Sequence, residues 1–563
     1  MGGFDDATRK VPIGFRNQIE HFLDLHNSSF RKHQSFMFVA LNIYQRRLSH
    51  LHTSLAMRKP RYAYVAPKIA SLTPEILNRV AKYIEQEKKV SDLPAEDKDM
   101  FTRVNEVSVI SANIPGTSAS KQKSRNEIRA YFGYFGLPQL FLTNASHSPL
   151  FQVIYGDELV DITKRFPELA SSVNRRIRVA SDAVAGETFF SHSIEIFFEH
   201  LLGWDHRRQG SKVQGGIFGK LRAYYGTAEF TDRGQLHGHF LIWLDGGINP
   251  RETHKKLKDN PIWRKQYFDF LEDIIHHQAP EVDIHLDADF EPHAQCPPDP
   301  KDPSFDVEFP CEIKRCAEVL QKHNVPCRKV CFKYGSEDCR FGFPHDIVPE
   351  TSFDEESNSI LLKCLDPMMN WFNPYILTFC RHNHDLRWIL SGKSAKAAMI
   401  YITDYITKDD EQIHHTLSTF SAAVGKAADH TTNDPKDRTR AYLHSCLAAQ
   451  IRYRKIHAQQ CVRYCRGKTD VMCSHTTVPL LSTALLSYMR QTYPALSNHR
   501  SSSDPPGRQG EDHDGDDDNS ESDNEVDNIQ QVESSFQKIC LFDQEHPLNR
   551  QHLGHWMRMT PTL

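Results

Sequence analysis

The stretch Leu236–Leu244, LHGHFLIWL, constrains the fold of this chain more than any other. Side chains alternate between the two faces of a β-strand, so His237 and His239 point to the same side. Leu241 and Trp243 continue that side, while apolar residues at 240, 242 and 244 occupy the other. A strand that is apolar on both faces lies inside a sheet rather than at its edge. We therefore predict a central strand that holds two imidazoles on one face.

A second strand is predicted just before it, at residues 222–231, and residues 232–235, DRGQ, have turn chemistry. The two strands should form a hairpin. Two neutral imidazoles on one face can bind a single divalent ion. Glu229 is the candidate third ligand, because a carboxylate suits Mg²⁺ or Mn²⁺. The sequence leaves the register of the hairpin open, and Thr231 is the alternative residue near the site.

Residues 393–408 predict a helix that carries Tyr401 and Tyr405 one turn apart on one face, with Lys408 beyond them. A phenol, whose pKa is about 10, is a weak nucleophile. It can attack phosphorus when a metal polarises the phosphate and a cation stabilises the developing charge. Aromatic residues at this spacing more often pack in a core. The conjunction with the two-histidine strand favours a nucleophilic role that ends in a phosphotyrosine link.

Six of the 13 cysteines lie between Cys296 and Cys339, which indicates a metal site rather than core packing. Thiolates together with an imidazole suit Zn²⁺ in a closed tetrahedral site, and reduced, partly buried thiols are the alternative. A zinc ion would explain how a loop-rich segment with little core is ordered. The candidate zinc ligands are His323, Cys327, Cys331 and Cys339, with Cys311 and Cys316 as further candidates.

The net charge of −4 conceals an acidic segment. Residues 501–528 hold 11 acidic residues and one arginine, so the rest of the chain carries +6. A mildly basic body is compatible with a nucleic-acid partner and equally with an ordinary solvated surface. No apolar run reaches the roughly 18 residues that span a bilayer, and the N-terminus lacks a signal-peptide pattern. We expect a soluble intracellular protein with no membrane partner.

Several stretches, taken in order, resemble the replication-initiator-like domain of Helitron transposases, known as the Helitron helicase-like N-terminal domain. The resemblance is carried first by RGQLHGHFLIWL and, far downstream, by YITDYITK. GLPQLFLTNASHSPL resembles the family's first motif, a strand that ends in Thr-Asn. CRFGFP at 339–344 resembles its Cys-Arg-Phe-x-x-Pro element, and CRHNHDLRWIL at 380–390 resembles its Arg-x-Asn-x-Asp segment. The resemblance covers roughly residues 36–480.

This resemblance implies that His237 and His239 are metal ligands, that Tyr401 and Tyr405 are nucleophiles, and that Lys408 is the lysine of their helix. It implies an antiparallel sheet of the HUH type, as in phage and plasmid rolling-circle initiators. It also implies cleavage and rejoining of single-stranded DNA, with a 5′-phosphotyrosine and a free 3′-hydroxyl. The candidate DNA contacts are Arg233 in the hairpin turn, Arg340 among the aromatic residues of the insertion, and Arg381 and Asn383 in the last motif.

Two features depart from the family pattern. Asn144 is followed by Ala145, where the family usually has a proline. The family continues into a superfamily 1 helicase, but this sequence has no G-x-x-x-x-G-K-[ST] motif, and residues 216–220 match it poorly. The chain is therefore expected to be a fragment, a split gene product or a decayed copy, and to cut and join DNA without a motor of its own. A helicase acting in trans is the candidate partner for unwinding.

The predicted fold class is α+β, with a central antiparallel sheet flanked by helices, a Cys-rich zinc-binding insertion and additional helices. Local patterns predict a strand at 140–143, a loop at 108–124, helices at 36–55, 71–88, 125–135 and 252–280, a mainly helical stretch at 150–205, a loop-rich segment at 290–350 and a mainly helical region at 410–495. The predicted parts are an N-terminal segment (1–35), a mainly helical part with the first-motif strand (36–205), the hairpin with its following helix (206–290), the Cys/His-rich insertion (291–350), the tyrosine helix with further helices (351–495), an acidic disordered linker (496–530) and a C-terminal tail (531–563).

The sequence thus predicts a metal-dependent nickase and strand transferase that acts on single-stranded DNA. A catalytically decayed or domesticated copy that only binds single-stranded DNA is the alternative. Nuclear residence follows from the expected DNA substrate alone.

Overall fold

The structure is a computed structural model of the full chain. Residues Met1–Thr476 form one compact unit and Thr477–Leu563 a second. Nearly all the residues described belong to the first unit, and everything that follows concerns that unit. The structure describes residues 10–11, 13–26, 28–58, 66–67, 69–86, 93–94, 97–98, 110–145, 171–230, 236–247, 250–286, 290, 292, 297–332, 338–356, 359–389, 413–429, 434–478 and 492.

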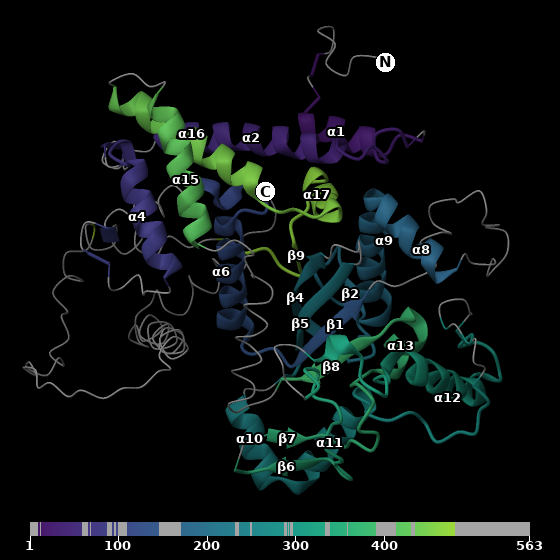
Figure 1. Ribbon diagram of the computed structural model, residues 1–563. Helices are drawn as coiled ribbons and strands as arrows, with labels where there is room; N and C mark the ends of the chain where they lie inside the picture. The colour runs from purple at the N-terminus through teal and green to yellow at the C-terminus, as the bar shows by residue number, and fades with distance from the viewer. Residues whose placement is uncertain are drawn as a thin grey trace, which may run out of the picture. The chain divides into compact units, whose positions relative to one another are not determined.

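A five-stranded antiparallel sheet organises the fold, with the strand order β8-β1-β5-β4-β9 (Figure 1). The central strand β5 is the two-histidine stretch, and its hairpin partner β4 lies on one side. The predicted α+β class with an antiparallel sheet is confirmed. The five strands are β1 (Leu140–Ala145), β4 (Leu221–Phe230), β5 (Leu236–Leu244), β8 (His384–Trp388) and β9 (Val471–Cys473).

Apolar residues cover both faces of the sheet, as the sequence of β5 predicts. Phe240 and Ile242 pack on one face with residues of helices α9, α11 and α13. Leu241 and Trp243 pack on the other face with Ile128 and Tyr131 of helix α6. The four helices are α6 (Ser118–Phe135), α9 (Ala183–Ile196), α11 (Pro261–Ile274) and α13 (Pro374–Cys380). The sheet core is therefore two-sided, which fixes the orientation of every β5 side chain.

Two glycines make room for the ring of Phe240, which is fully buried. A Cβ on Gly238 would lie 2.5 Å from the Phe240 ring, and a Cβ on Gly226, directly opposite Phe240 on β4, would also collide with it. Gly238 therefore separates the two histidines because a side chain at that position would enter the space of the Phe240 ring.

Two smaller cores lie among the remaining helices. Helices α4, α15 and α16 enclose one core, and helices α1, α2 and α17 pack around the other. Their bounds are α1 (Phe15–Leu23), α2 (Phe36–Met57), α4 (Pro74–Glu85), α15 (Ile413–Ala428), α16 (Pro435–Tyr453) and α17 (Ala458–Cys465). Among the described residues, no helix combines the length and the apolar character needed to cross a membrane.

Shorter elements complete the described part of the chain. Side chains at helix starts accept hydrogen bonds from backbone N–H groups, as Thr117 does for α6 and Asp182 for α9. The remaining elements are α8 (Ser172–Ser181), α10 (Pro250–Asp259), α12 (Phe305–Cys316), the 3-10 helices η2 (Ser111–Asn113) and η6 (Lys329–Cys331), the π-helices η3 (Phe197–Leu201) and η5 (Ala317–Gln321), and the short strands β2 (Trp204–Asp205), β3 (Gly210–Ser211), β6 (Ser352–Asp354) and β7 (Ser359–Leu361).

The structure corrects three local predictions. The loop predicted at 108–124 contains η2 and the first turns of α6, which begins at Ser118 because Thr117 caps it. The segment predicted as loop-rich, 290–350, contains the helix α12. The region predicted as mainly helical, 410–495, contains the edge strand β9, which pairs with β4. The predicted helix at 393–408 lies outside the described residues.

The packing of Phe240 generates a stability prediction. We expect Gly238→Ala to lower the free energy of unfolding by about 1–3 kcal/mol, because a buried ring cannot move aside for the added methyl group. The measurement is urea unfolding followed by tryptophan fluorescence. Gly133→Ala is the control: nothing lies within 4 Å of the added Cβ, and alanine favours a helix by up to about 1 kcal/mol over glycine. Equal midpoints for Gly238→Ala and the wild type would contradict the packing argument.

Candidate functional site

The hairpin brings the predicted metal ligands to one face of the sheet. Residues directly opposite each other in an antiparallel pair share a face, and Glu229 lies opposite His237. The Nε2 atom of His239 lies 3.1 Å from Oε2 of Glu229. The register left open by the sequence thus places Glu229 beside both histidines. Thr231, the alternative, lies outside the described residues.

Burial differs across these three residues. The side chain of His239 is 9% exposed, and that of Glu229 is 38% exposed. Burial lowers the pKa of His237, and the neighbouring His239 lowers it further, while the Glu229 carboxylate opposes both effects. A lowered pKa keeps the His237 ring neutral over a wider pH range, and the neutral ring is the form that binds a metal. The site therefore has a fixed inner histidine and a carboxylate that solvent reaches.

Neighbouring strands hold this site in place. Phe141 of β1 lies parallel to the His239 ring, with 6.2 Å between ring centroids. Thr227, opposite His239, donates a hydrogen bond from its hydroxyl to the carbonyl oxygen of Asp470. The backbone N–H of Ala228 donates to the same carbonyl oxygen at 2.8 Å. The edge next to β9 thus restrains the strand that carries Glu229.

Two imidazoles and one carboxylate are donor types that suit a divalent cation such as Mn²⁺, which accepts both nitrogen and oxygen ligands. In this structure their ligand atoms do not all lie within 4.8 Å of one another. His237 is half-buried and Glu229 partly exposed, so both are accessible at the solvent side of the site. Tyr401, Tyr405, Lys408 and Arg233 lie outside the described residues. Their predicted roles therefore stay predictions.

The Cys-rich insertion gathers a second set of ligands. His323, Cys327, Cys331 and Cys339 bring their ligand atoms within 4.8 Å of one another, and this is the only such group of His, Cys, Asp and Glu among the described residues. The Nε2 atom of His323 lies 3.3 Å from Sγ of Cys327, and 3.6 Å from Sγ of both Cys331 and Cys339. Tetrahedral Zn²⁺ separates its nitrogen and sulfur ligands by about 3.5 Å. This Cys₃His cluster could hold a metal such as zinc.

Surrounding groups support the Cys₃His cluster. Burial raises the pKa of the Cys339 thiol, but hydrogen bonds from the backbone N–H groups of Phe341 and Phe343 lower it below its ordinary value overall. The Phe343 ring stacks on His323 at 4.3 Å between centroids. The two N–H groups orient the sulfur of Cys339, and the Phe343 ring orients His323. Groups around metal ligands commonly have this effect. Cys311 and Cys316 lie outside the cluster.

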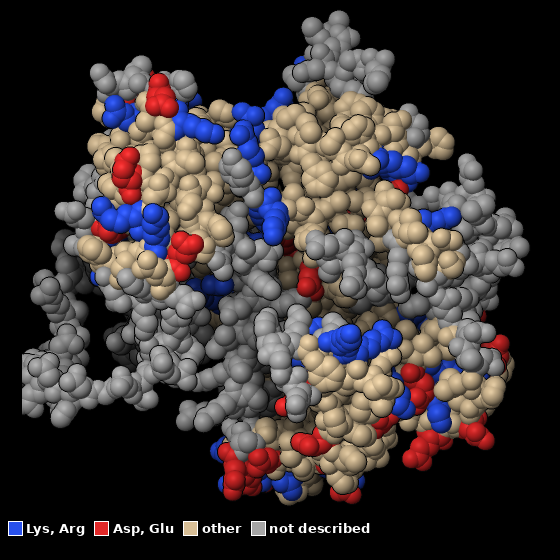
Figure 2. Space-filling model, viewed as in Figure 1, with Lys and Arg blue, Asp and Glu red and all other residues tan. Residues whose placement is uncertain are grey.

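The predicted DNA contacts fall into different environments. Arg340 and Asn383 are exposed, and the Arg340 guanidinium lies over the Phe341 ring. Arg381, in contrast, is 6% exposed and pairs with Glu312, with its Nη1 atom 2.9 Å from Sγ of Cys316. Arg381 lies just before β8 and contacts α12, so it links these two elements inside the protein rather than facing solvent. Figure 2 shows Lys and Arg in separate groups on the visible face, with Asp and Glu between them. Charge alone therefore does not mark a DNA path.

Several residues around the site were not indicated by any local sequence pattern. Phe141 and Thr143 of β1 flank His239, and Asp385 of β8 lies opposite Thr143 in the same cross-strand row. The partner strand β9 is three residues long and is separated from β4 by more than 200 positions. The sequence signal that pointed to β1 was its Thr-Asn motif. This motif lies at the end of β1 that pairs with the histidine segment of β5.

The fold and site define an α+β protein with an antiparallel sheet and a histidine pair on its central strand. Residues 19–242 match the family model described as the Helitron helicase-like domain at the N-terminus. This part of the chain is therefore similar to the Helitron helicase-like domain, which suggests a Helitron transposase-related function. The matched segment contains Glu229, His237 and His239 and ends before the Cys₃His cluster. A search of curated proteins found no match.

The Cys₃His geometry predicts that purified protein binds about one zinc ion per chain in this cluster. We expect Cys327→Ser combined with Cys331→Ser to lose that ion and to lower the thermal unfolding midpoint, because the insertion would lose its cross-link. Atomic emission spectroscopy counts the metal, and a thermal melt follows stability. Cys473→Ser, which changes an exposed cysteine elsewhere, should keep the zinc. Unchanged zinc content in the double variant would exclude the cluster as the metal site.

Proposed function

We propose that this protein nicks single-stranded DNA and transfers the strand through a metal-dependent reaction with a phosphotyrosine intermediate. The observation that carries the proposal is the Glu229–His239 contact of 3.1 Å, with His237 directly opposite Glu229. These three residues lie on one face of the central hairpin, inside the segment that matches a Helitron helicase-like domain.

In this proposal, His237, His239 and Glu229 hold Mg²⁺ or Mn²⁺. A bound divalent ion supplies Lewis-acid stabilisation of the scissile phosphate and of the leaving oxygen. The residues of the chain do the rest. His239, held between Phe141 and the carboxylate, keeps one ligand direction fixed, and a rigid strand maintains that geometry better than a loop. Glu229 adds a negative charge that offsets part of the charge of the ion.

The covalent step belongs to Tyr401 or Tyr405. The tyrosine oxygen attacks the phosphorus as its phenolic proton is lost, and a P–O bond forms to the 5′ side of the nick. The bond to the 3′-oxygen breaks, and that oxygen takes up a proton to become a free 3′-hydroxyl. Lys408 stabilises the negative charge that develops. Since the phosphotyrosine ester conserves the bond energy, a 3′-hydroxyl can later attack it and rejoin DNA without another energy source.

Two further features are part of the proposal. A helicase acting in trans is the proposed partner that would supply unwound DNA. A DNA substrate of this kind places the protein in the nucleus. Both proposals depend on the nicking activity.

A denaturing gel tests the reaction. We expect the protein to form a covalent adduct with labelled single-stranded oligonucleotides in Mn²⁺ and to form none in EDTA. Tyr401→Phe combined with Tyr405→Phe should abolish the adduct, because no phenolic oxygen remains to attack. An adduct that persists in this double variant refutes the tyrosine assignment. Oligonucleotide binding without any adduct, over many sequences, would favour the binding-only alternative.

The metal ligands generate a separate prediction. We expect Glu229→Gln, a change of one charge with little change in shape, to reduce the adduct-forming rate at least about 10-fold and to raise the Mn²⁺ concentration needed for half-maximal rate. His239→Gln should have a larger effect. His206→Ala changes an exposed histidine in the turn between β2 and β3 and serves as the control. Wild-type Mn²⁺ dependence in both ligand variants would remove these residues from the site.

A further inference from the structure

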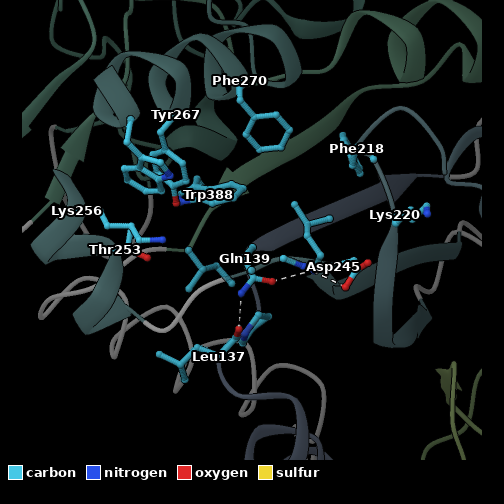
Figure 3. Close-up of a pocket in the computed structure, with 17 residues that line it drawn as sticks. Leu137, Gln139, Phe218, Lys220, Asp245, Thr253, Lys256, Tyr267, Phe270 and Trp388 are labelled. Atoms are coloured by element: carbon cyan, nitrogen blue, oxygen red, sulfur yellow. Dashed lines mark hydrogen bonds between the residues drawn. The ribbon is translucent and has the colours of Figure 1, made fainter. Parts of the chain in front are cut away.

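A pocket lies at the end of the sheet opposite the histidine pair (Figure 3). It has a volume of about 420 Å³, within the usual range of small-ligand sites, roughly 300–1,000 Å³. The loop before β1, the loop before β4, the end of β5 and the end of β8 meet there. His239 and Leu244 are five residues apart on β5, so about 17 Å of strand separates the pocket from the histidine site.

Aromatic rings from two different segments form one wall of this pocket. Trp263 and Tyr267 of α11 are stacked, with 4.6 Å between centroids and 21° between planes. Trp388 of β8 meets Tyr267 edge-on at 5.8 Å and Phe270 at 6.1 Å. Trp263, Tyr267, Phe270 and Trp388 are all only partly buried, although aromatic side chains of this size usually complete a core. The wall is therefore suited to hold a flat ring.

Two lysines lie at opposite sides of the pocket. Lys256 of α10 and Lys220, just before β4, are both exposed, and Figure 3 shows them flanking Trp388. The Nζ atom of Lys256 lies 5.5 Å from the centroid of the Trp263 ring. A ligand that combines a flat ring with negative charge on either side matches this arrangement. Asp245 also lines the pocket, so the negative charge of a ligand would lie beside the lysines rather than beside this carboxylate.

The floor of the pocket is held rigidly. The side-chain amide of Gln139 accepts a hydrogen bond from the backbone N–H of Leu244 at 2.8 Å and donates one to the carbonyl oxygen of Leu137 at 2.9 Å. A Cβ on Gly247 would lie 2.6 Å from that amide, so the amide packs directly against the backbone at this position. Gln139 thus ties the loop before β1 to the end of β5, and the pocket keeps its shape without a ligand.

We propose that this pocket binds an unpaired nucleobase of DNA, with the base against the Trp263–Trp388 wall and its flanking phosphates near Lys220 and Lys256. A base inside a duplex is already stacked, so only an unpaired base can present its face to an aromatic wall. That the base belongs to the strand cut at the histidine site rests on the proposed function. The pocket would hold that strand at a fixed distance from the cut, which would set which nucleotide reaches the metal.

An abasic scan tests the proposal. The protein is the full chain with Tyr401→Phe and Tyr405→Phe, without added Mg²⁺ or Mn²⁺, so that binding is measured without cleavage. The probe is a fluorescein-labelled single-stranded oligonucleotide in which one base at a time is removed, and the readout is fluorescence anisotropy. We expect removal of one base, or of two adjacent bases, to weaken binding about 10-fold, which is about 1.4 kcal/mol, because the missing base no longer stacks on the aromatic wall.

The same binding assay is repeated with variants of the pocket. Trp263→Leu should weaken binding of the intact oligonucleotide about 10-fold and should abolish the effect of the abasic position, whereas Trp263→Phe should keep most of the affinity. Lys220→Ala and Lys256→Ala should each weaken binding and lower its salt dependence. Lys258→Ala, on the same helix as Lys256 and paired with Glu355 outside the pocket, should change neither. A flat abasic scan together with wild-type affinity of Trp263→Leu overturns the proposal.

Competition with dAMP separates the two possible sources of the base. If the oligonucleotide displaces dAMP from the wild-type protein and Trp263→Leu loses both ligands, the base belongs to a DNA strand. If dAMP binds through Trp263 but the oligonucleotide does not displace it, the site takes a free nucleotide and the assignment to DNA is wrong. Failure of the adduct assay would refute the nickase but would leave the abasic scan unchanged.

Discussion

The register between β4 and β5 is the constraint on which the candidate site depends. With Glu229 opposite His237 and Thr227 opposite His239, all four residues share one face. A slip of one residue in β5 would turn both histidines away from the face that carries Glu229. Such a slip is opposed by burial on both sides, since it would also exchange Phe240 with Leu241 between two differently shaped cores. The hydrophobic packing of the sheet thus selects the arrangement of its polar residues.

The sequence predicted most of this arrangement because its signal is local. Alternation along nine residues places His237 and His239 on one face, and the adjoining strand with its turn predicts the hairpin. The face of the sheet on which Glu229 lies could not be predicted, because it depends on which residues pair across the turn. The strand β9 was missed because its three residues carry no alternating pattern and their partner lies far away in the sequence. The burial of Arg381 was missed for a similar reason: its partner Glu312 is 69 positions earlier.

The helix α12 was missed because Pro310 lies within it and charged residues surround it. The Cys₃His cluster was easier to predict, since the residue types themselves carry the chemistry and all four ligands lie within 17 positions. The aromatic pocket had no local signal at all. Its rings come from α11 and β8, which are more than 100 positions apart and meet only because both border the sheet.

The sheet therefore presents two different surfaces at its two ends. One end carries two imidazoles and a carboxylate, which we propose bind a divalent ion, and the other carries aromatic rings and lysines, which we propose bind a base and its phosphates. Because the sheet between the two ends is rigid, the distance between them is constant. A protein with a constant distance of this kind can select the nucleotide to be cut by its separation from the nucleotide held in the pocket. The insertion with the Cys₃His cluster joins this framework through the segment at 366–370, where the backbone N–H of His323 donates to Met368.

The central claim is that the hairpin face binds a divalent ion. Electron paramagnetic resonance of Mn²⁺ measures this directly, because the signal of the free ion falls as the protein binds it. Zinc-loaded wild-type protein should bind about one Mn²⁺ per chain, and the variant with His237→Gln and His239→Gln should leave the ion free while unfolding at a similar temperature. Equal Mn²⁺ binding by the two folded proteins would contradict the account.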